Sequence, residues 1–266
     1  MEPKNIGEAV EIYRGMRMEQ RRLERLPESC TPRDTIEAYE LQNALNVRLA
    51  LLGLGAVSGH KIGCTTKVMQ EYLKIDQPCS GGIYANTAFH ERGERAHGEY
   101  CGPGVECEMA VRLGADLGPA GAPYDKDSVA DAVESCMAAI EIVDDRFIDY
   151  RELDMPTLLA DDFFNAGCVL GAPNKDWRAL DILALRGEMS INGNPVGEGY
   201  GRDVMGHPFN VLAWLANSFV ARGRALKAGE FVLTGSLVET KWCEAGDEVR
   251  IEIDGLGTAE MKFTAS

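Results

Sequence analysis

Residues 105–111 read Val-Glu-Cys-Glu-Met-Ala-Val, and this alternation of apolar and acidic side chains predicts a β-strand. Successive side chains point to opposite faces of a strand, so Glu106 and Glu108 share one face and the apolar residues share the other. Two carboxylates on one face repel each other unless something positive lies between them. Mg²⁺ and Mn²⁺ favour carboxylate oxygens, so the pair indicates a metal site, with a solvated strand face as the alternative.

A third acid strengthens the metal interpretation. Glu141 lies in the apolar run 138–143, which reads Ala-Ala-Ile-Glu-Ile-Val. An acid buried in such a run needs a partner or a metal ion. Glu106, Glu108 and Glu141 are therefore the candidate ligands of one Mg²⁺ or Mn²⁺.

Composition places the chain among ordinary soluble globular proteins. Its 266 residues suffice for one large domain or two small ones, and 45% of them are hydrophobic. With 27 basic and 42 acidic residues, the net charge of −15 argues against a nucleic-acid partner and against an anionic membrane surface. No stretch of about 18 uninterrupted apolar residues predicts a membrane span.

Cysteine usage and the start of the chain indicate a cytoplasmic protein. The eight cysteines include no C-x-x-C pair and no Cys/His set with zinc spacing. The first five residues, Met-Glu-Pro-Lys-Asn, lack the basic-then-apolar pattern of a signal peptide. We therefore expect a reducing cytoplasm.

The pattern of apolar residues predicts helices first and mostly strands afterwards, which indicates the α+β class. Helix is expected over about residues 5–53, with a start at Thr31-Pro32-Arg33-Asp34, then up to Lys74, over 127–139 with Ser128 as a cap, and over 208–222. Strands are expected over 60–63, 185–191, 231–235 and 248–253, with a hairpin turn at Asn192-Gly193.

Four further polar segments could carry chemistry, and each has a structural alternative. Lys61 is either a surface stem or a buried ammonium that needs an anion. The pair Asp161-Asp162 fits a loop cap equally well, and His207 is typical of a residue that begins a helix. The segment 234–236, Thr-Gly-Ser, ends a strand where a hydroxyl and free amides could hold a carboxylate.

Several segments, taken in order, resemble the fumarylacetoacetate hydrolase superfamily and, within it, the 2-keto-4-pentenoate hydratase / 4-oxalocrotonate decarboxylase branch. They are Gly59-His60-Lys61-Ile62-Gly63-Cys64-Thr65, Ile75-Asp76-Gln77-Pro78, Val105 to Ala110, Ala139 to Asp144, Gly206-His207-Pro208 and Leu233-Thr234-Gly235-Ser236. The resemblance covers nearly the whole chain, including its helical N-terminal part.

This resemblance implies a fold, a cofactor and a set of site residues. The fold is a strand-rich mixed roll, with a helical N-terminal region over residues 1–80 packed on a catalytic metal-binding domain over 81–266, the two forming one integrated unit. One Mg²⁺ or Mn²⁺ falls on Glu106, Glu108 and Glu141. The implied catalytic residues are Lys61, Asp76 and Asp161, and the implied substrate-binding residues are Thr234, Ser236, Cys79 and Phe164.

The activity implied is hydration of a 2-hydroxy-2,4-dienoate to a 4-hydroxy-2-oxo acid in the catabolism of aromatic compounds, by a homo-oligomer. Decarboxylation of a 2-keto diacid and hydrolysis of an acylpyruvate are the alternatives, and a non-catalytic family member is the competing class.

Two positions depart from the pattern of this branch. Hydratases often carry Asp where this chain has Cys79, and many members read Ala-Asp-Asn-x-Ser where residues 160–164 read Ala-Asp-Asp-Phe-Phe. We therefore expect a pocket that prefers an apolar tail to a second carboxylate, because no Arg or Lys is obvious beside Phe163 and Phe164.

Overall fold

The computed structural model describes residues 1–65, 70–71, 75 and 77–265. Most of the helix expected to end at Lys74 lies outside these residues, and so does Asp76. The helices are α1 (Pro3–Met18), α2 (Thr35–Leu49), α4 (Lys126–Ala130), α5 (Met155–Ala160) and α6 (Pro208–Ala221). A short π-helical segment, η2 (Ala50–Leu54), continues α2.

The predicted N-terminal helical region is confirmed, although it is two helices with an irregular connection over residues 19–34. Asp34 begins α2, because its carboxylate accepts a hydrogen bond from the backbone N–H of Glu37 at 2.9 Å. Leu41, Leu45 and Leu49 repeat every four residues and are fully buried. Their face therefore belongs to the core and anchors α2 to the rest of the molecule.

The described strands form one mixed sheet. They are β1 (Val57–Gly63), β2 (Cys79–Tyr84), β3 (Ala88–His90), β4 (Arg92–Ala96), β5 (Pro103–Leu113), β6 (Val133–Asp144), β7 (Asn165–Leu170), β8 (Arg186–Ile191), β9 (Asn194–Tyr200), β10 (Phe231–Ser236), β11 (Lys241–Trp242), β12 (Glu248–Ile253) and β13 (Gly257–Thr264). Their order is β2-β1-β10-β5-β6-β7-β3-β4-β13-β12-β8-β9, with β11 paired to β5.

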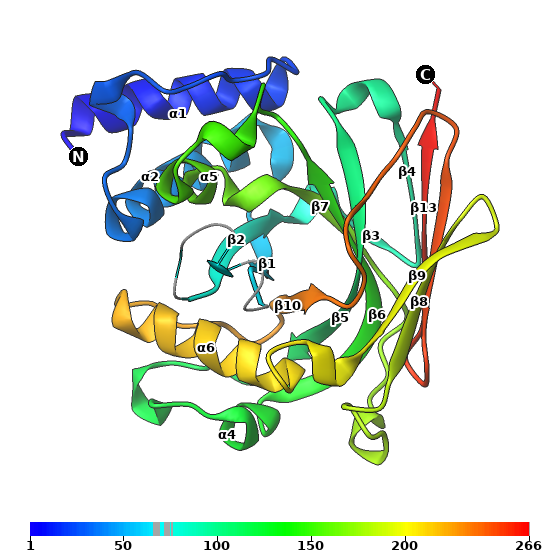
Figure 1. The fold of residues 1–266 in the computed structure, drawn as a ribbon. Helices are drawn as coiled ribbons and strands as arrows, with labels where there is room; N and C mark the ends of the chain where they lie inside the picture. The colour runs from blue at the N-terminus through cyan, green and yellow to red at the C-terminus, as the bar shows by residue number, and fades with distance from the viewer. Residues whose placement is uncertain (66–69, 72–74, 76, 266) are drawn as a thin grey trace.

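The sheet curls around the middle of the molecule (Figure 1). Helices α1, α2 and α5 gather on one side of β1 and β2, and α6 and α4 lie on the other side (Figure 1). The long strands β5 and β6 pair along their whole length at the centre of the sheet order. Most of their residues are buried, so this central pair is covered on both faces.

The helix expected over residues 127–139 is wrong. The structure has a short helix, α4, and then the long strand β6. Asp125, rather than Ser128, caps α4: its carboxylate accepts from the backbone N–H of Ser128 at 2.8 Å. A strand buried on both faces is apolar throughout, and periodicity alone does not separate it from a buried helix.

The expected hairpin, the expected helix at residues 208–222 and the expected strands are confirmed. The predicted hairpin joins β8 to β9, with Asn192 and Gly193 at φ values of 53° and 78°. These positive angles are those of a type I′ turn, which Asn-Gly favours. The predicted helix at residues 208–222 is α6, and the predicted strands near residues 231 and 248 are β10 and β12.

The helical N-terminal region and the sheet are joined through β1 and β2. Both strands lie at one end of the same sheet that contains β5 and β6. A boundary at residue 80 would fall inside β2. Among the described helices, none has the length and apolar character needed to cross a lipid bilayer.

Candidate metal and active site

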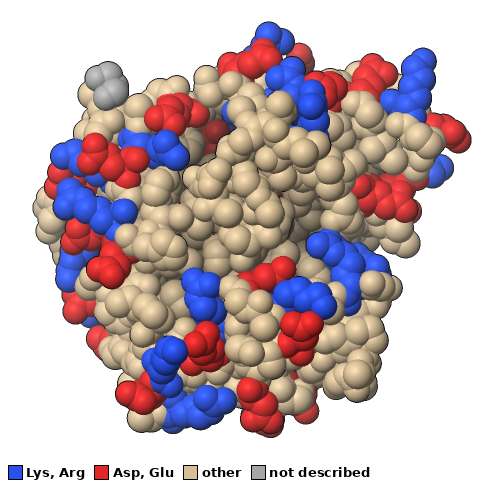
Figure 2. All heavy atoms as spheres, turned by 180° about the vertical axis from the view of Figure 1, so that it is seen from behind, with Lys and Arg blue, Asp and Glu red and all other residues tan. Residues whose placement is uncertain are grey.

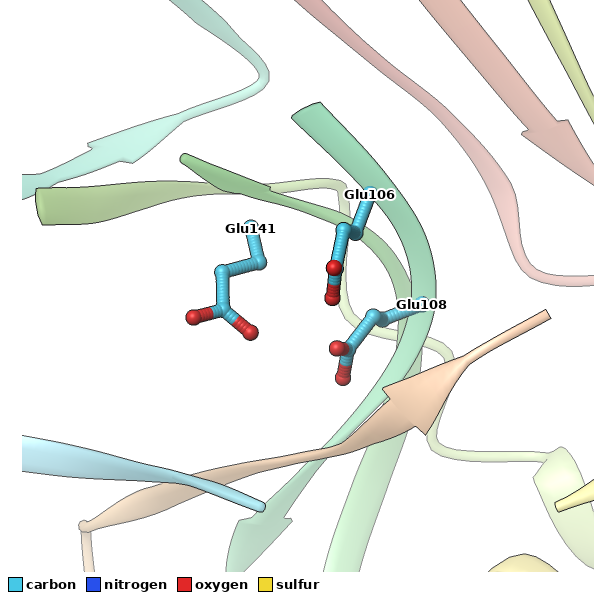
Figure 3. Close-up of side chains that lie close together, drawn as sticks. All are labelled: Glu106, Glu108 and Glu141. Carbon is cyan, nitrogen blue, oxygen red and sulfur yellow. The ribbon is translucent and has the colours of Figure 1, made fainter. Parts of the chain in front are cut away.

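The three candidate glutamates meet at the centre of the sheet. Glu106 and Glu108 project from the same face of β5, and Glu141 lies directly opposite Glu106 on β6. Their side chains point toward one another (Figure 3). One carboxylate oxygen from each lies within 4.8 Å of the other two. Since Glu108 and Glu141 are fully buried, the alternative of a solvated strand face is excluded for them.

Each carboxylate accepts a hydrogen bond from a neutral donor on another segment. Thr240 donates its hydroxyl to Glu106, and the backbone N–H of Gly235 donates to Oε2 of Glu108 at 2.7 Å. The side-chain amide of Asn165 donates to Oε1 of Glu141 at 3.0 Å. Oε1 of Glu108 and Oε2 of Glu141 are buried and have no partner among the described residues. Buried carboxylate oxygens without a partner are costly, so these two oxygens fit the role of cation ligands.

Lys61 belongs to this cluster. Its Nζ lies 3.1 Å from Oε1 of Glu141, and its side chain is buried. The Phe163 ring lies near the ammonium, with 5.1 Å between Nζ and the ring centroid. The buried-ammonium interpretation of Lys61 is thus confirmed, and the surface interpretation is wrong.

The charge of the cluster suits a divalent ion. Three carboxylates and one ammonium have a net charge of −2 when all are ionised. Burial, reinforced by the other two glutamates, raises the pKa of Glu108 well above its usual value, and burial also raises that of Glu141. Burial opposes the charge of Lys61, but the acids outweigh it and raise the pKa of Lys61. All-oxygen donors of this kind fit Mg²⁺ or Mn²⁺.

A strained turn brings Phe163 and Asn165 to the cluster. Asp162, Phe163 and Phe164 have φ values of 51°, 47° and 67°, a left-handed run that non-glycine residues rarely adopt. The buried Asp162 carboxylate holds the turn by accepting from the backbone N–H of Gly82 at 2.8 Å and from the Tyr84 hydroxyl at 3.1 Å. The turn therefore sets the surroundings of both Lys61 and Glu141.

Asp161 lies in an ion-pair network beside this turn. Its carboxylate accepts from Nε of Arg17 at 2.5 Å and from Nε of Arg146 at 2.8 Å. Arg146 also donates to the backbone oxygen of Asn165 at 3.2 Å. Each carboxylate oxygen of Asp161 thus accepts from one guanidinium group. Because Asp161 holds Arg146, which in turn contacts Asn165, Asp161 has the contacts of a residue that positions Asn165. Its direct participation in catalysis stays a prediction.

The hydroxyls at the end of β10 are directed at the backbone. Thr234 is fully buried and donates to the backbone oxygen of Met109 at 2.9 Å. Ser236 donates to the backbone oxygen of Val238. Between these two residues, the backbone N–H of Gly235 donates a hydrogen bond to Oε2 of Glu108. The segment thus orients Glu108 in the glutamate cluster, and its role in holding a substrate carboxylate stays a prediction.

The two remaining substrate-binding candidates lie in different places. Cys79 lines a cavity of about 890 Å³ whose wall also includes Arg222 and Arg224. Phe164 packs edge-on against the rings of Phe147 and Tyr150 instead. The sequence-based premise that no Arg or Lys lies beside Phe163 and Phe164 is wrong for Phe163, because its ring centroid lies 5.1 Å from Nζ of Lys61. His207 begins α6, and its Nδ1 accepts from the backbone N–H of Phe209 at 3.0 Å, as the structural alternative predicts.

Sequence patterns did not indicate Asn165, Thr240 or Arg17. Asn165 donates to Glu141 across a separation of 24 residues, and Thr240 donates to Glu106 across 134. Such contacts depend on the strand order, which local patterns do not contain. The only available signal was the polar residue that directly follows Phe163 and Phe164 at the start of an apolar strand.

A family model described as fumarylacetoacetate (FAA) hydrolase C-terminal matches residues 87–264. The chain belongs to the fumarylacetoacetate hydrolase family. Two similar curated relatives are hydratases. The 2-hydroxyhexa-2,4-dienoate hydratase of Comamonas testosteroni is 35% identical over 84% of this chain and 86% of that protein. The 2-keto-4-pentenoate hydratase of Burkholderia vietnamiensis is 32% identical over 90% of each.

Two solved structures share the fold of this chain. The 4-oxalocrotonate decarboxylase from Pseudomonas putida G7, complexed with magnesium and adipate, covers 99% of this chain and 98% of its own, with a TM-score of 0.91 at 22% identity. The fumarylpyruvate hydrolase from Pseudomonas aeruginosa, in complex with Mn²⁺ and pyruvate, has a TM-score of 0.61 and covers 78% of this chain at 12% identity. The predicted roll with its helical N-terminal region is confirmed.

The raised pKa values of Glu108 and Glu141 predict opposite pH trends for stability and metal binding. Above the pKa of about 4.3 that an unfolded Glu has, the metal-free folded state binds more protons than the unfolded state. The free energy of unfolding of the metal-free protein should therefore fall as the pH rises from the pKa of an unfolded Glu to the raised pKa values of Glu108 and Glu141. Metal affinity should strengthen over the same range, because the ion displaces those protons. Thermal unfolding in the presence of a chelator measures the first trend, and Mn²⁺ titration at several pH values measures the second. If stability and metal affinity both rose with pH, the assignment of Glu108 and Glu141 as metal ligands would be contradicted.

Proposed function

We propose that this protein is a divalent-metal-dependent hydratase that adds water to a 2-hydroxy-2,4-dienoate and releases a 4-hydroxy-2-oxo acid. The observation that carries the proposal is the buried cluster of Glu106, Glu108 and Glu141 with Lys61 against it. Hydratases that are about a third identical over most of the chain support this reaction over the others. By analogy with them, the substrate arises in aromatic catabolism.

The proposed mechanism uses the chain's own groups around the metal ligands. Glu106, Glu108 and Glu141 would hold a divalent cation, which would supply Lewis-acid polarisation of the substrate's 2-oxygen. Nζ of Lys61 holds the substrate carboxylate or transfers a proton, since it is the described ammonium in contact with this cluster. Asn165 fixes the orientation of Glu141, and the burial of Glu108 and Glu141 keeps bulk water from their carboxylates.

An activity assay tests the proposal directly. We expect Mg²⁺ or Mn²⁺ to support consumption of 2-hydroxypenta-2,4-dienoate and formation of a 4-hydroxy-2-oxo acid, and we expect a chelator to abolish it. Product analysis separates the reactions, because decarboxylation of 4-oxalocrotonate releases carbon dioxide and acylpyruvate cleavage yields two acids. A protein that binds Mn²⁺ but converts none of these substrates would be the non-catalytic family member.

We also propose that the protein assembles into a homo-oligomer through α2 and η2. Leu51 and Val47 lie one turn apart and are 78% and 65% exposed, whereas Leu45 and Leu49 face the core. Large exposed apolar side chains of this kind mark contact surfaces. The proposed contact surface is therefore the outer face of α2 and η2.

A charge on this outer face should reduce the size of the assembly. We expect Leu51→Glu to give a smaller particle than wild type at micromolar concentration, measured by light scattering. Leu183→Glu, a change at a less exposed leucine away from α2, is the matched control. A wild-type protein that is monomeric would overturn the proposal.

The proposed setting is the cytoplasm, with a small organic acid as partner. The eight cysteines are all free thiols, which suits a reducing compartment. Figure 2 shows basic and acidic side chains interspersed over one face of the molecule, without a continuous basic patch among the described residues there. This distribution and the negative net charge give no support to a nucleic-acid partner.

A further inference from the structure

The cavity that contains Cys79 lies between α2, α5 and α6. Its volume of about 890 Å³ is in the range of small-molecule sites, which is roughly 300–1,000 Å³. Much of its wall is apolar and includes Met155, Leu159 and Trp214. None of the three metal-ligand candidates lines it. It is therefore a separate space from the one between the glutamates.

Cys79 connects this cavity with the glutamate cluster. It pairs with Gly63 at the end of β1, two residues beyond Lys61. Burial raises the pKa of the Cys79 thiol, and the Lys61 ammonium is close enough to oppose that rise. Cys79 thus lies in the cavity wall on the side of Lys61 and the glutamate cluster.

Arg222 lines the cavity, and one of its guanidinium nitrogens is unpaired. Its plane lies over Tyr39, with 3.7 Å from Cζ to the ring centroid, and its Nε donates to the backbone oxygen of Ser218 at 3.1 Å. Nη2 is buried and has no hydrogen-bond partner among the described residues. No described carboxylate lies within ion-pair distance of it. A buried N–H of a charged group without an acceptor is costly, so a ligand acceptor is the natural partner.

The electrostatic surroundings favour an anion at this point. Burial and the neighbouring Arg224 lower the pKa of Arg222, which indicates that its charge is incompletely compensated. Arg224 is also in the wall, and its Nη1 donates to the neutral side chain of Asn43 at 2.7 Å. The wall contains one acid, Glu40, which is exposed and forms no described ion pair with either arginine.

We propose that Arg222 is a carboxylate-binding subsite, which holds the charged end of a small organic acid whose apolar chain lies against Leu159 and Trp214. The planar guanidinium suits a carboxylate because its N–H groups match the two oxygens. Stacking on Tyr39 fixes the plane in advance, so little side-chain freedom is lost on binding. This subsite does not depend on the proposed hydratase activity. The carboxylate belongs either to the far end of the substrate or to a second small acid.

Binding without metal tests the subsite by itself. In the presence of a chelator, Trp214 fluorescence and calorimetry should detect hexanoate and adipate but not the neutral hexanamide. We expect Arg222→Gln to weaken hexanoate binding at least about tenfold, the equivalent of roughly 1.4 kcal/mol, and Arg222→Lys to restore part of it. Arg178→Gln, which removes an arginine stacked on Trp177, is the matched control and should bind as wild type does.

Turnover then separates the two sources of the carboxylate. If the substrate supplies it, Arg222→Gln should lower kcat/KM at least about tenfold for a dienoate with a second carboxylate and leave a methyl-ended dienoate within twofold. If a second acid supplies it, neither kcat/KM changes while hexanoate still requires Arg222 for binding. Equal hexanoate binding by wild type and by a folded Arg222→Gln variant, or no binding by wild type, would overturn the proposal.

Discussion

Replacing Glu106 by Gln is expected to abolish metal binding and turnover while the fold is retained. The change removes one negative charge and one strong oxygen ligand from the cluster, and keeps the shape of the side chain. Changes to residues that only hydrogen-bond to metal ligands typically lower metal affinity or activity by about 10–100-fold. Loss of a ligand itself should therefore lower both by more than about 100-fold. Mn²⁺ titration, turnover at saturating Mg²⁺ and thermal unfolding measure the three effects.

A matched control separates loss of a ligand from loss of any carboxylate on the central strands. Glu134 lies on β6, the strand of Glu141, but is exposed and paired with Lys175 at the surface. We expect Glu134→Gln to bind Mn²⁺ and turn over as wild type does. Unchanged metal affinity in Glu106→Gln would remove Glu106 from the ligand set.

Replacing Lys61 by Met is expected to lower kcat by about 10² or more, the usual contribution of a residue that transfers a proton. The ammonium lies 3.1 Å from Glu141 and is buried beside Phe163, so no solvent group replaces it easily. Met has a similar length and an apolar stem, which suits the contact with Phe163. Steady-state kinetics at saturating metal give kcat and KM separately.

The pattern of kinetic change assigns the role of Lys61. A fall in kcat with KM unchanged supports proton transfer, and a rise in KM with kcat unchanged supports a role in holding the substrate carboxylate. Lys175→Met is a suitable control, because Lys175 is exposed and pairs with Glu134. Near-normal kinetics in a folded Lys61→Met protein would return Lys61 to a structural role.

The sequence determined which side chains share a strand face. The alternation in residues 105–111 placed Glu106 and Glu108 together, because a period of two residues is a local property of extended backbone. Two other local patterns were equally informative. The Asn192-Gly193 dipeptide located a hairpin turn, and apolar residues at helical spacing located α6. Apolar spacing failed at residues 127–139, where β6 is buried on both faces and its continuous apolar run gave no strand period.

Only the tertiary structure decided how these local elements meet. The pairing of Glu106 with Glu141 follows from the register of β5 on β6, and the position of Lys61 follows from the packing of β1 beside β10. Arg222 reaches Tyr39 across 183 residues of chain, from α6 to α2. Local propensity does not encode such contacts, because their free energy depends on which distant surfaces become buried together. The sequence therefore determined the common strand face of Glu106 and Glu108, whereas packing decided the burial of the glutamate cluster, its contact with Lys61 and the position of Arg222 in the wall of the neighbouring cavity.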